Sequence, residues 1–171
     1  PLVRVLEGPL IPPFTGQDGV PRTSVPGLPR MERARFVGEY PFARIELDDE
    51  KIPLEITLEA FNPFIPLKPE ESGIPAVVLR YKLKNLSGKT VKASIAGSIL
   101  SPVGFDAVGK IAAIGSEKFG ANRALIRKGD VLSGLVMSSD KVKPGTPAFG
   151  TMALTTTWKD ITYLTHWVRG D

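Results

Sequence analysis

Apolar residues fall at every second position between Lys51 and Ala60, and this alternation constrains the fold more than any other feature of the sequence. The apolar members of the pattern are Ile52, Leu54, Ile56, Leu58 and Ala60. A β-strand points successive side chains to opposite faces of its sheet, so the pattern predicts one buried face and one exposed face. On a helix the same residues would scatter around the whole cylinder. We therefore predict a strand here, with the rest of the chain packed onto it.

Strand-like segments recur along the chain, separated by glycine- and proline-rich turns. The predicted strands cover residues 3–6, 31–37, 42–47, 52–60, 77–83, 89–100, 108–114, 119–126, 131–137, 149–158 and 161–168. They predict an all-β fold with little or no helix: an antiparallel, supersandwich-like β-sandwich of roughly nine to eleven strands, with its sheets packed face to face. A closed barrel is the alternative.

Two proline-rich segments interrupt this pattern. Residues 8–29 pack turn signals into one stretch and predict an arm on the surface or a segment that docks on a neighbouring domain. We assign residues 1–35, a strand plus this arm, and residues 36–171, the β-sandwich, to the same domain. Residues 61–75 hold four prolines, which exclude a helix or a central strand. Because this second segment is also apolar, we expect it to cover the end of its own sandwich or to face another domain.

Composition excludes several classes of protein. A chain of 171 residues suits one domain with a sizeable core. The net charge of +4 is spread along the chain, without the basic patch of a nucleic-acid-binding protein or the basic amphipathic helix of a membrane-surface protein. The absence of cysteine excludes disulfides, thiolate catalysis and cysteine metal sites, and it slightly favours a cytoplasmic location. We find no signal segment and no transmembrane segment. The chain opens directly on a strand-like segment at Pro1, which predicts that it begins inside a longer gene product.

The residues that could carry chemistry do not form a recognisable catalytic motif. His166 is the single histidine and lies in a predicted strand, so it is expected to be a half-exposed strand residue rather than the base of a triad. Asp48, Asp49 and Glu50 form a charged turn without the spacing of a calcium loop. Glu46 and Asp48 could share one strand face about 7 Å apart, within the range of glycosidase carboxyl pairs, but such neighbours are common on exposed strands. We predict no catalytic residue, no metal site and no cofactor.

Three aromatic residues near the end of the chain offer another possibility. They are Trp158, Tyr163 and Trp167. Together they could form a platform for sugar rings, but we favour buried core aromatics. The triplet that begins at Asn85 matches a glycosylation acceptor, and we interpret it as a hairpin-type turn. Its residues alone therefore predict a β domain but do not indicate which reaction, if any, it takes part in.

A family resemblance supplies a function. Two runs carry most of it: Gly38-Glu39-Tyr40-Pro41-Phe42-Ala43 and Ile52-Pro53-Leu54-Glu55-Ile56-Thr57-Leu58-Glu59-Ala60-Phe61-Asn62-Pro63-Phe64-Ile65-Pro66-Leu67. Further pieces follow in the same order: Ser72-Gly73-Ile74-Pro75-Ala76, Lys84-Asn85-Leu86-Ser87-Gly88-Lys89 and Phe149-Gly150-Thr151-Met152-Ala153-Leu154. From about residue 36 to its end, the chain resembles the N-terminal domain of glycoside hydrolase family 116, which contains the non-lysosomal glucosylceramidase (bile acid β-glucosidase) and microbial β-glucosidases. Residues 59–67 are the most specific part of the match.

The resemblance implies that the chemistry lies outside this chain. In that family a β-sandwich precedes an (α/α)6 helical barrel, whose glutamate nucleophile and aspartate acid/base perform retaining hydrolysis of β-glucosides. No stretch here resembles those motifs, so the resemblance predicts a non-catalytic domain that braces the catalytic barrel and helps to shape its entrance, where a β-glucoside could bind. The chain is shorter than the sandwich expected for the family, which predicts a truncated or a divergent member.

We predict that one apolar segment contacts this barrel. Its residues are Phe61, Asn62, Pro63, Phe64, Ile65, Pro66 and Leu67. Such a cluster is too apolar to be left exposed without a purpose, although it could equally cap the core of its own domain. The alternative function is a stand-alone carbohydrate- or protein-binding β-sandwich.

Overall fold

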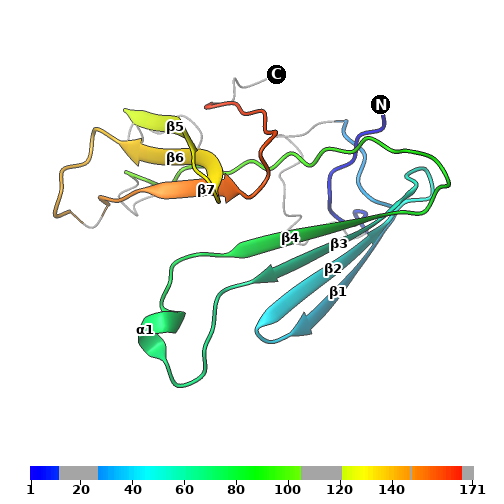
Figure 1. The fold of residues 1–171 in the computed structure, drawn as a ribbon, viewed down its shortest axis with the longest axis horizontal. Coiled ribbons are helices and arrows are strands. Elements are labelled where there is room, and N and C mark those ends of the chain that lie inside the picture. The colour runs from blue at the N-terminus through cyan, green and yellow to red at the C-terminus, as the bar shows by residue number, and fades with distance from the viewer. Residues whose placement is uncertain (12–26, 105–120, 147, 167–171) are drawn as a thin grey trace. The chain divides into compact units, whose positions relative to one another are not determined.

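The computed structural model describes residues 1–11, 27–104, 121–146 and 148–166, which fall into two compact units, Pro1–Ala93 and Ser94–Asp171. Within these residues the chain forms seven strands and one four-residue helix (Figure 1). The strands make two antiparallel sheets, one of four strands in the first unit and one of three in the second. The all-β class predicted from the sequence is therefore confirmed.

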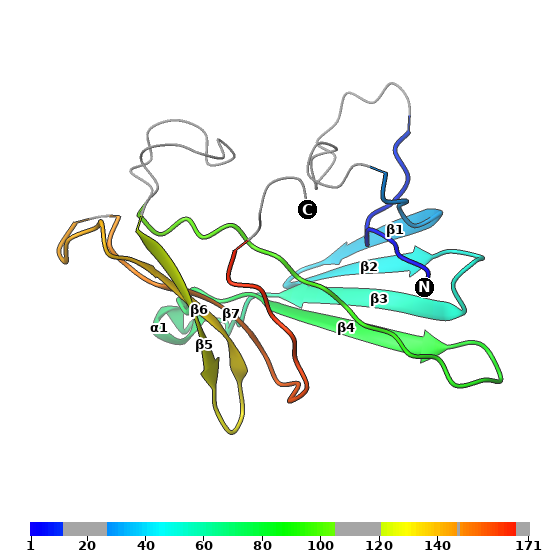
Figure 2. The same cartoon turned by 90° about the horizontal axis from the view of Figure 1, so that it is seen from above.

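The first unit is built on a four-stranded antiparallel meander. Its strands follow one another in chain order: β1 (Arg33–Glu39), β2 (Phe42–Asp48), β3 (Leu54–Phe61) and β4 (Val78–Asn85) (Figure 2). A tight turn at Tyr40 and Pro41 joins β1 to β2, because Glu39 pairs directly with Phe42. The connection from β3 to β4 is much longer and contains helix α1 (Pro69–Ser72).

One face of this sheet carries the core. In register, Leu47 lies between Ala34 and Ile56, and Leu83 extends the same row. Met31 covers Leu47 and Ile56, and these three side chains are the buried centre of the unit. The partly buried residues around them are Leu6, Ile45, Ile52, Leu54 and Tyr81. The period-two alternation predicted for residues 52–60 is confirmed at Ile52, Leu54 and Ile56, which turn to this core, although the strand itself begins at Leu54.

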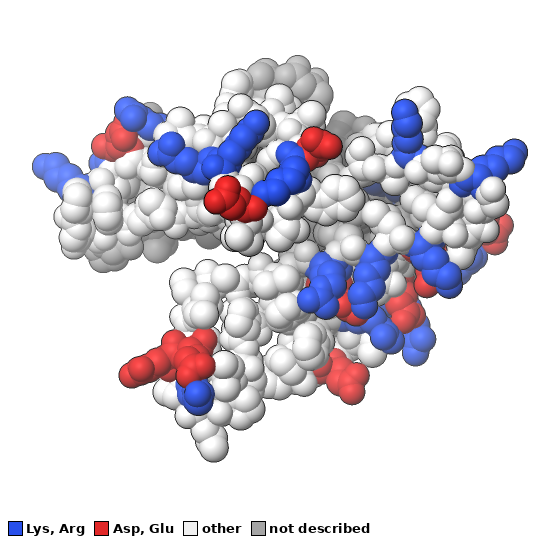
Figure 3. Space-filling view, in the orientation of Figure 1, with Lys and Arg blue, Asp and Glu red and all other residues white. Residues whose placement is uncertain are grey.

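The opposite face of the sheet carries charges of alternating sign (Figure 3). Glu59 on β3 accepts hydrogen bonds from Lys82 at 2.6 Å and from Arg80 at 3.4 Å, both on β4. Glu46 on β2 pairs with Arg44 at 3.1 Å and with Arg35 at 3.4 Å. Each exposed pair stabilises the sheet only slightly, because solvent screens it.

The N-terminal segment is tied to the core face. Its backbone bonds run from the Val5 N–H to the Pro29 carbonyl (2.9 Å) and from the Met31 N–H to the Glu7 carbonyl (3.0 Å). The Arg4 guanidinium donates to both carboxylate oxygens of Asp49, with Nε at 2.5 Å from Oδ2 and Nη2 at 3.3 Å from Oδ1. Asp49 is 5% exposed. The hydrogen bonds from Arg4 lower the pKa of this carboxyl, and the Lys51 N–H adds to the effect.

The second unit is built on a three-stranded sheet in which β6 (Ser133–Ser139) lies between β5 (Asn122–Lys128) and β7 (Met152–Thr156). The central strand is the most buried of the three. Gly134 allows β7 to approach closely: a Cβ at this position would lie 2.1 Å from the Leu154 carbonyl oxygen. The backbone therefore requires glycine here.

Several predicted strands are wrong. The described chain has seven strands rather than roughly nine to eleven. Residues 89–100 form no strand, so the turn expected at Asn85 does not lead into a hairpin; the turn itself is present, with the Ser87 N–H bonded to Asn85 Oδ1. Residues 161–166 also form none, and residues 3–6 supply a single bridge from Val5 to Arg30. A segment with a period-two pattern forms a strand only where a neighbouring segment pairs with its backbone through hydrogen bonds. The strand predicted at 108–114 lies outside the described residues.

The prediction that residues 61–75 contain no helix is also wrong, because this connection holds α1. Pro69 occupies the first turn of α1, where a backbone N–H has no partner within the helix and its loss costs little. The face-to-face sandwich stays a prediction, as do its alternative, the closed barrel, and the division at residue 35.

We predict that Gly134→Ala destabilises the second unit by about 1–3 kcal/mol, because the new methyl group meets the β7 backbone, which cannot move without breaking the ladder. Gly150→Ala is the matched control, since a Cβ there meets no atom within 4 Å, and it should change stability by less than about 0.5 kcal/mol. Thermal denaturation followed by circular dichroism measures both. Equal midpoints for the two variants would contradict the close approach.

A second prediction concerns acid stability. Because the folded pKa of Asp49 lies below its unfolded value of about 3.9, the ionised Asp49–Arg4 pair stabilises the fold fully above that pH, and the contribution is lost as the pH falls through the folded pKa. Asp49→Asn should lower the Tm at pH 7 by several degrees and flatten its decline below pH 4. Asp48→Asn, at the exposed neighbouring position, should do neither. A steep acid transition in Asp49→Asn would refute this role.

Candidate docking surface

The predicted docking residues lie at one end of the four-stranded sheet. Phe61 ends β3, and residues 62–77, which we call the crossover loop, lead to Val78 at the start of β4. In register, Phe61 pairs with both Phe42 and Val78. The β1–β2 turn and the crossover loop therefore emerge at the same end of the sheet (Figure 1).

Four aromatic side chains gather at this end, and we call them the aromatic end: Tyr40, Phe42, Phe61 and Phe64. The rings of Tyr40 and Phe64 meet edge to face with centroids 5.3 Å apart, and those of Phe42 and Phe61 are tilted at 5.4 Å. The Arg80 guanidinium lies 5.7 Å from the Phe61 ring centroid, within cation–π distance. Tyr40 is 80% exposed, Phe42 52% and Phe64 43%. An exposed cluster of this kind is typical of an interaction site.

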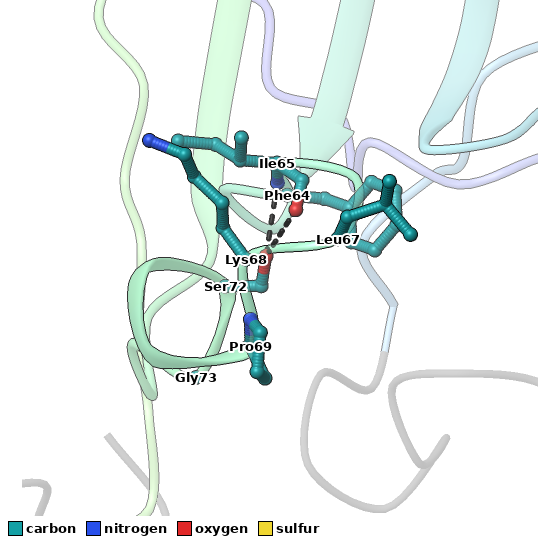
Figure 4. Close-up of a pocket in the computed structure, with 7 residues that line it drawn as sticks. All are labelled: Phe64, Ile65, Leu67, Lys68, Pro69, Ser72 and Gly73. Atoms are coloured by element: carbon teal, nitrogen blue, oxygen red, sulfur yellow. Dashed lines mark hydrogen bonds between the residues drawn. The ribbon is translucent and has the colours of Figure 1, made fainter.

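Side-chain hydrogen bonds hold the crossover loop in shape. Asn62 Nδ2 donates to the carbonyls of Ala76 (2.7 Å) and Ile74 (3.2 Å), which closes the base of the loop. Ser72 Oγ accepts from the Ile65 N–H and donates to the Ile65 carbonyl, both at 2.9 Å. These two bonds tie the end of α1 to the segment that leads from β3 into the helix (Figure 4). The loop is thus ordered by its own polar groups rather than by a core beneath it.

The tip of the loop presents Leu67 to solvent. This side chain is fully exposed, at 101% of its reference area. Its backbone has φ +64°, in the left-handed region that a leucine rarely adopts. Leu67 and Phe64 point to one side of the loop, and Ile65 and Lys68 to the other (Figure 4).

An open hollow of about 420 Å³ lies between the tip and α1. Its walls come from the following seven residues: Phe64, Ile65, Leu67, Lys68, Pro69, Ser72 and Gly73. The hollow is largely apolar, and the charged side chain of Lys68 at its edge pairs with Glu71 at 2.9 Å. An apolar lining of this kind is typical of surfaces that contact a macromolecular partner.

The structure brings the seven predicted docking residues to one end of the sheet, Phe61 on β3 and the other six on the crossover loop, but it gives them different tasks. Phe64, Ile65, Pro66 and Leu67 are exposed, whereas Phe61 and Pro63 are partly buried. Asn62 is exposed, and its side chain is used to close the loop. Their docking role stays a prediction.

Sequence reasoning missed four residues of this surface: Tyr40, Phe42, Ser72 and Arg80. The turn dipeptide Tyr40-Pro41 was the available signal. Pairing the predicted strands 42–47 and 52–60 across a tight turn would have placed Tyr40 and Phe42 beside Phe61.

Of the carboxyl groups considered in the sequence analysis, Glu46 and Asp49 are held in ion pairs. Glu46 contacts two arginines, and Asp49, in the turn considered for calcium, is bound to Arg4. The hydrogen bond from Lys82 lowers the pKa of Glu59, as Arg4 lowers the pKa of Asp49. A general acid needs the opposite shift, so neither group is suited to that role.

Two expectations about the second unit require correction. Trp158 is 72% exposed and Tyr163 is also exposed, so they are not the buried core aromatics that the sequence favoured. Both positions lie outside the regular strands, where no sheet partner covers them. Trp167 lies outside the described residues. His166 is exposed and not in a strand, and its Nδ1 lies 3.3 Å from Thr165 Oγ1.

The described ranges of the chain hold no group of three or more His, Cys, Asp or Glu side chains that could share a metal ion. In the same ranges, no helix has the length and apolarity needed to cross a bilayer.

The fold and this surface define an all-β domain with an exposed apolar surface at one end of its four-stranded sheet. Residues 15–170 match the family model described as "beta-glucosidase 2, glycosyl-hydrolase family 116 N-term". The match spans nearly the whole chain, so the chain belongs to the N-terminal domain family of glycoside hydrolase family 116, and the resemblance seen in the sequence is confirmed. A search of curated proteins found no match. Family membership makes this an N-terminal domain of a glycoside hydrolase and implies a catalytic partner domain in the same protein.

The loop geometry predicts a local effect of Ser72. Ser72→Ala removes both bonds to Ile65 and should lower the free energy of opening the loop by about 0.5–1.5 kcal/mol, with no effect on the sheet. Hydrogen exchange at residues 64–73 measures this change. Ser98→Ala, at an exposed serine outside the loop, is the control. Unchanged exchange in Ser72→Ala would show that the loop is held by other contacts.

Proposed function

We propose that this chain is a non-catalytic domain that braces the catalytic domain of a β-glucosidase or glucosylceramidase and contacts it through the aromatic end and the crossover loop. The observation that carries the proposal is the exposure of Tyr40 in the β1–β2 turn, and of Phe64 and Leu67 on the ordered crossover loop, in a family 116 N-terminal domain. A surface of this apolarity is stable when a partner covers it. In the family resemblance that partner is an (α/α)6 barrel.

Retaining hydrolysis needs two carboxyl groups about 5–5.5 Å apart, one of them with a raised pKa. Glu46 and Glu59 are each held by two basic side chains instead. This arrangement supports a structural role for the charged face, with the nucleophile and the acid/base in the barrel. A domain seated at the barrel in this way would also border its entrance, where the β-glucoside binds.

A second candidate function, a carbohydrate-binding module, has one observation in its favour. Trp158 and Tyr163 are exposed in the second unit, and flat aromatic surfaces bind sugar rings. The two functions differ in what these residues do: a binding module loses oligosaccharide affinity in Trp158→Ala, whereas a bracing domain keeps its effect on the barrel.

The bracing function predicts a loss of enzyme stability without a loss of chemistry. In the full-length protein, Phe64→Asp should weaken the coupling between the two domains by at least about 1 kcal/mol, because it places a charge in an apolar contact. The temperature at which aryl β-glucosidase activity is lost should fall, while kcat at low temperature stays unchanged. Phe149→Asp, at a similarly exposed phenylalanine of the second unit, is the control.

The same assay tests where the chemistry lies. Glu46→Gln and Glu59→Gln should retain wild-type turnover in the folded full-length protein. Turnover abolished by either variant, with the fold intact, would refute a non-catalytic domain.

A further inference from the structure

We propose that Leu67 is the anchor of the docking surface, inserted into an apolar pocket of the catalytic domain whose rim carries basic side chains. The inference rests on the proposed function and adds to it the contact residue and the chemistry of its receptor.

The backbone at the tip of the crossover loop forms a tight turn. The Lys68 N–H bonds to the Ile65 carbonyl at 3.1 Å, which closes a β-turn with Pro66 and Leu67 at its two central positions. Proline fixes a negative φ at the first of these, and Leu67 has φ +64° at the second. This combination defines a type II turn, in which the second central residue is normally glycine or asparagine. The chain therefore places a leucine where the turn favours glycine or asparagine.

The strained backbone at Leu67 projects its side chain into solvent from a fixed turn. A strained residue persists where its surroundings hold it, and here Ser72 and the turn bond fix the chain on both sides of the tip. No packing contact within this domain offsets the strain, because the Leu67 side chain is fully exposed. A prebuilt turn that projects one apolar side chain loses little entropy when it binds, which favours insertion into a pocket. Phe64 lies on the same side of the loop and widens the apolar contact (Figure 4).

The charges beside the tip indicate which partner the surface fits. Glu70 and Glu71 lie in the first turn of α1, and its last turn has no basic residue. Lys68 pairs with Glu71, which leaves Glu70 as the unbalanced charge beside the tip. Figure 3 shows these acidic side chains gathered around α1. A second copy docked on the same surface would bring like charges together, whereas a pocket rimmed by lysine or arginine would match them. Since the chain is an N-terminal domain of a glycoside hydrolase, we commit to its own catalytic domain as the partner.

A glycine substitution separates an anchor from a merely structural residue by the sign of its effect. Because glycine is favoured at φ +64°, Leu67→Gly should relax the turn if the residue is only structural, and it would then leave the full-length enzyme as stable as wild type or more so. As an anchor, Leu67→Gly should lower the temperature at which aryl β-glucosidase activity is lost. Leu86→Gly, at an exposed leucine beyond the far end of β4, should not. Unchanged or raised heat resistance in Leu67→Gly overturns the proposal.

Thiol labelling locates the contact directly, because this chain has no cysteine of its own. In the full-length protein, a charged maleimide should modify Leu67→Cys at least about tenfold more slowly than Leu86→Cys, and the two rates should converge on denaturation. Any labelling of the wild-type protein is subtracted.

The other outcomes overturn the inference in distinguishable ways. Fast labelling of Leu67→Cys with slow labelling of Phe64→Cys would refute the anchor and leave the docking surface in place. Fast labelling of both, together with two independent unfolding transitions, would refute the proposed function itself. Protection of Leu67→Cys that disappears on dilution would assign the contact to a second copy of the protein.

Discussion

The pairing register of β1–β4 is the constraint on which the rest of the first unit depends. With this register, Leu47 and Ile56 meet beneath Met31, while the charges of Glu46 and Glu59 meet their cations on the other face. A shift by one residue would exchange these faces and place the charges in the core. The same register brings Phe42 and Phe61 together at one end of the sheet, so the aromatic end is a consequence of how the core is built.

The docking surface combines a rigid support with a locally ordered loop. The sheet positions Phe42 and Phe61, whereas the crossover loop relies on Asn62 and Ser72 to hold its shape. No core lies under the tip, so its apolar residues add nothing to the stability of the unit and remain available to a partner. In the function that we propose, this separation lets the domain offer a preformed contact while the chemistry takes place in the neighbouring domain.

The sequence predicted the elements in which periodicity and pairing agree, and it failed where pairing decides alone. Ile56 and Leu47 were placed correctly because strict alternation on both strands points to one face. The strand expected at 89–100 has the same pattern but no neighbouring strand, which no local property reveals. Proline density hid the short helix at Pro69. Residues 61–67 were singled out by their apolarity, but the left-handed backbone of Leu67 and the ring contact of Tyr40 with Phe64 depend on geometry that arises only after the chain has folded.

The central claim is that the aromatic end and the crossover loop form the contact with the catalytic domain. An experimental structure of the full-length glycoside hydrolase tests it most directly, through the accessible area of Phe64 and Leu67 in the assembled protein. The account predicts that both side chains are buried against the catalytic domain, with a lysine or arginine of that domain near Glu70. A structure in which the loop projects into solvent, while another face of this domain contacts the barrel, would contradict it.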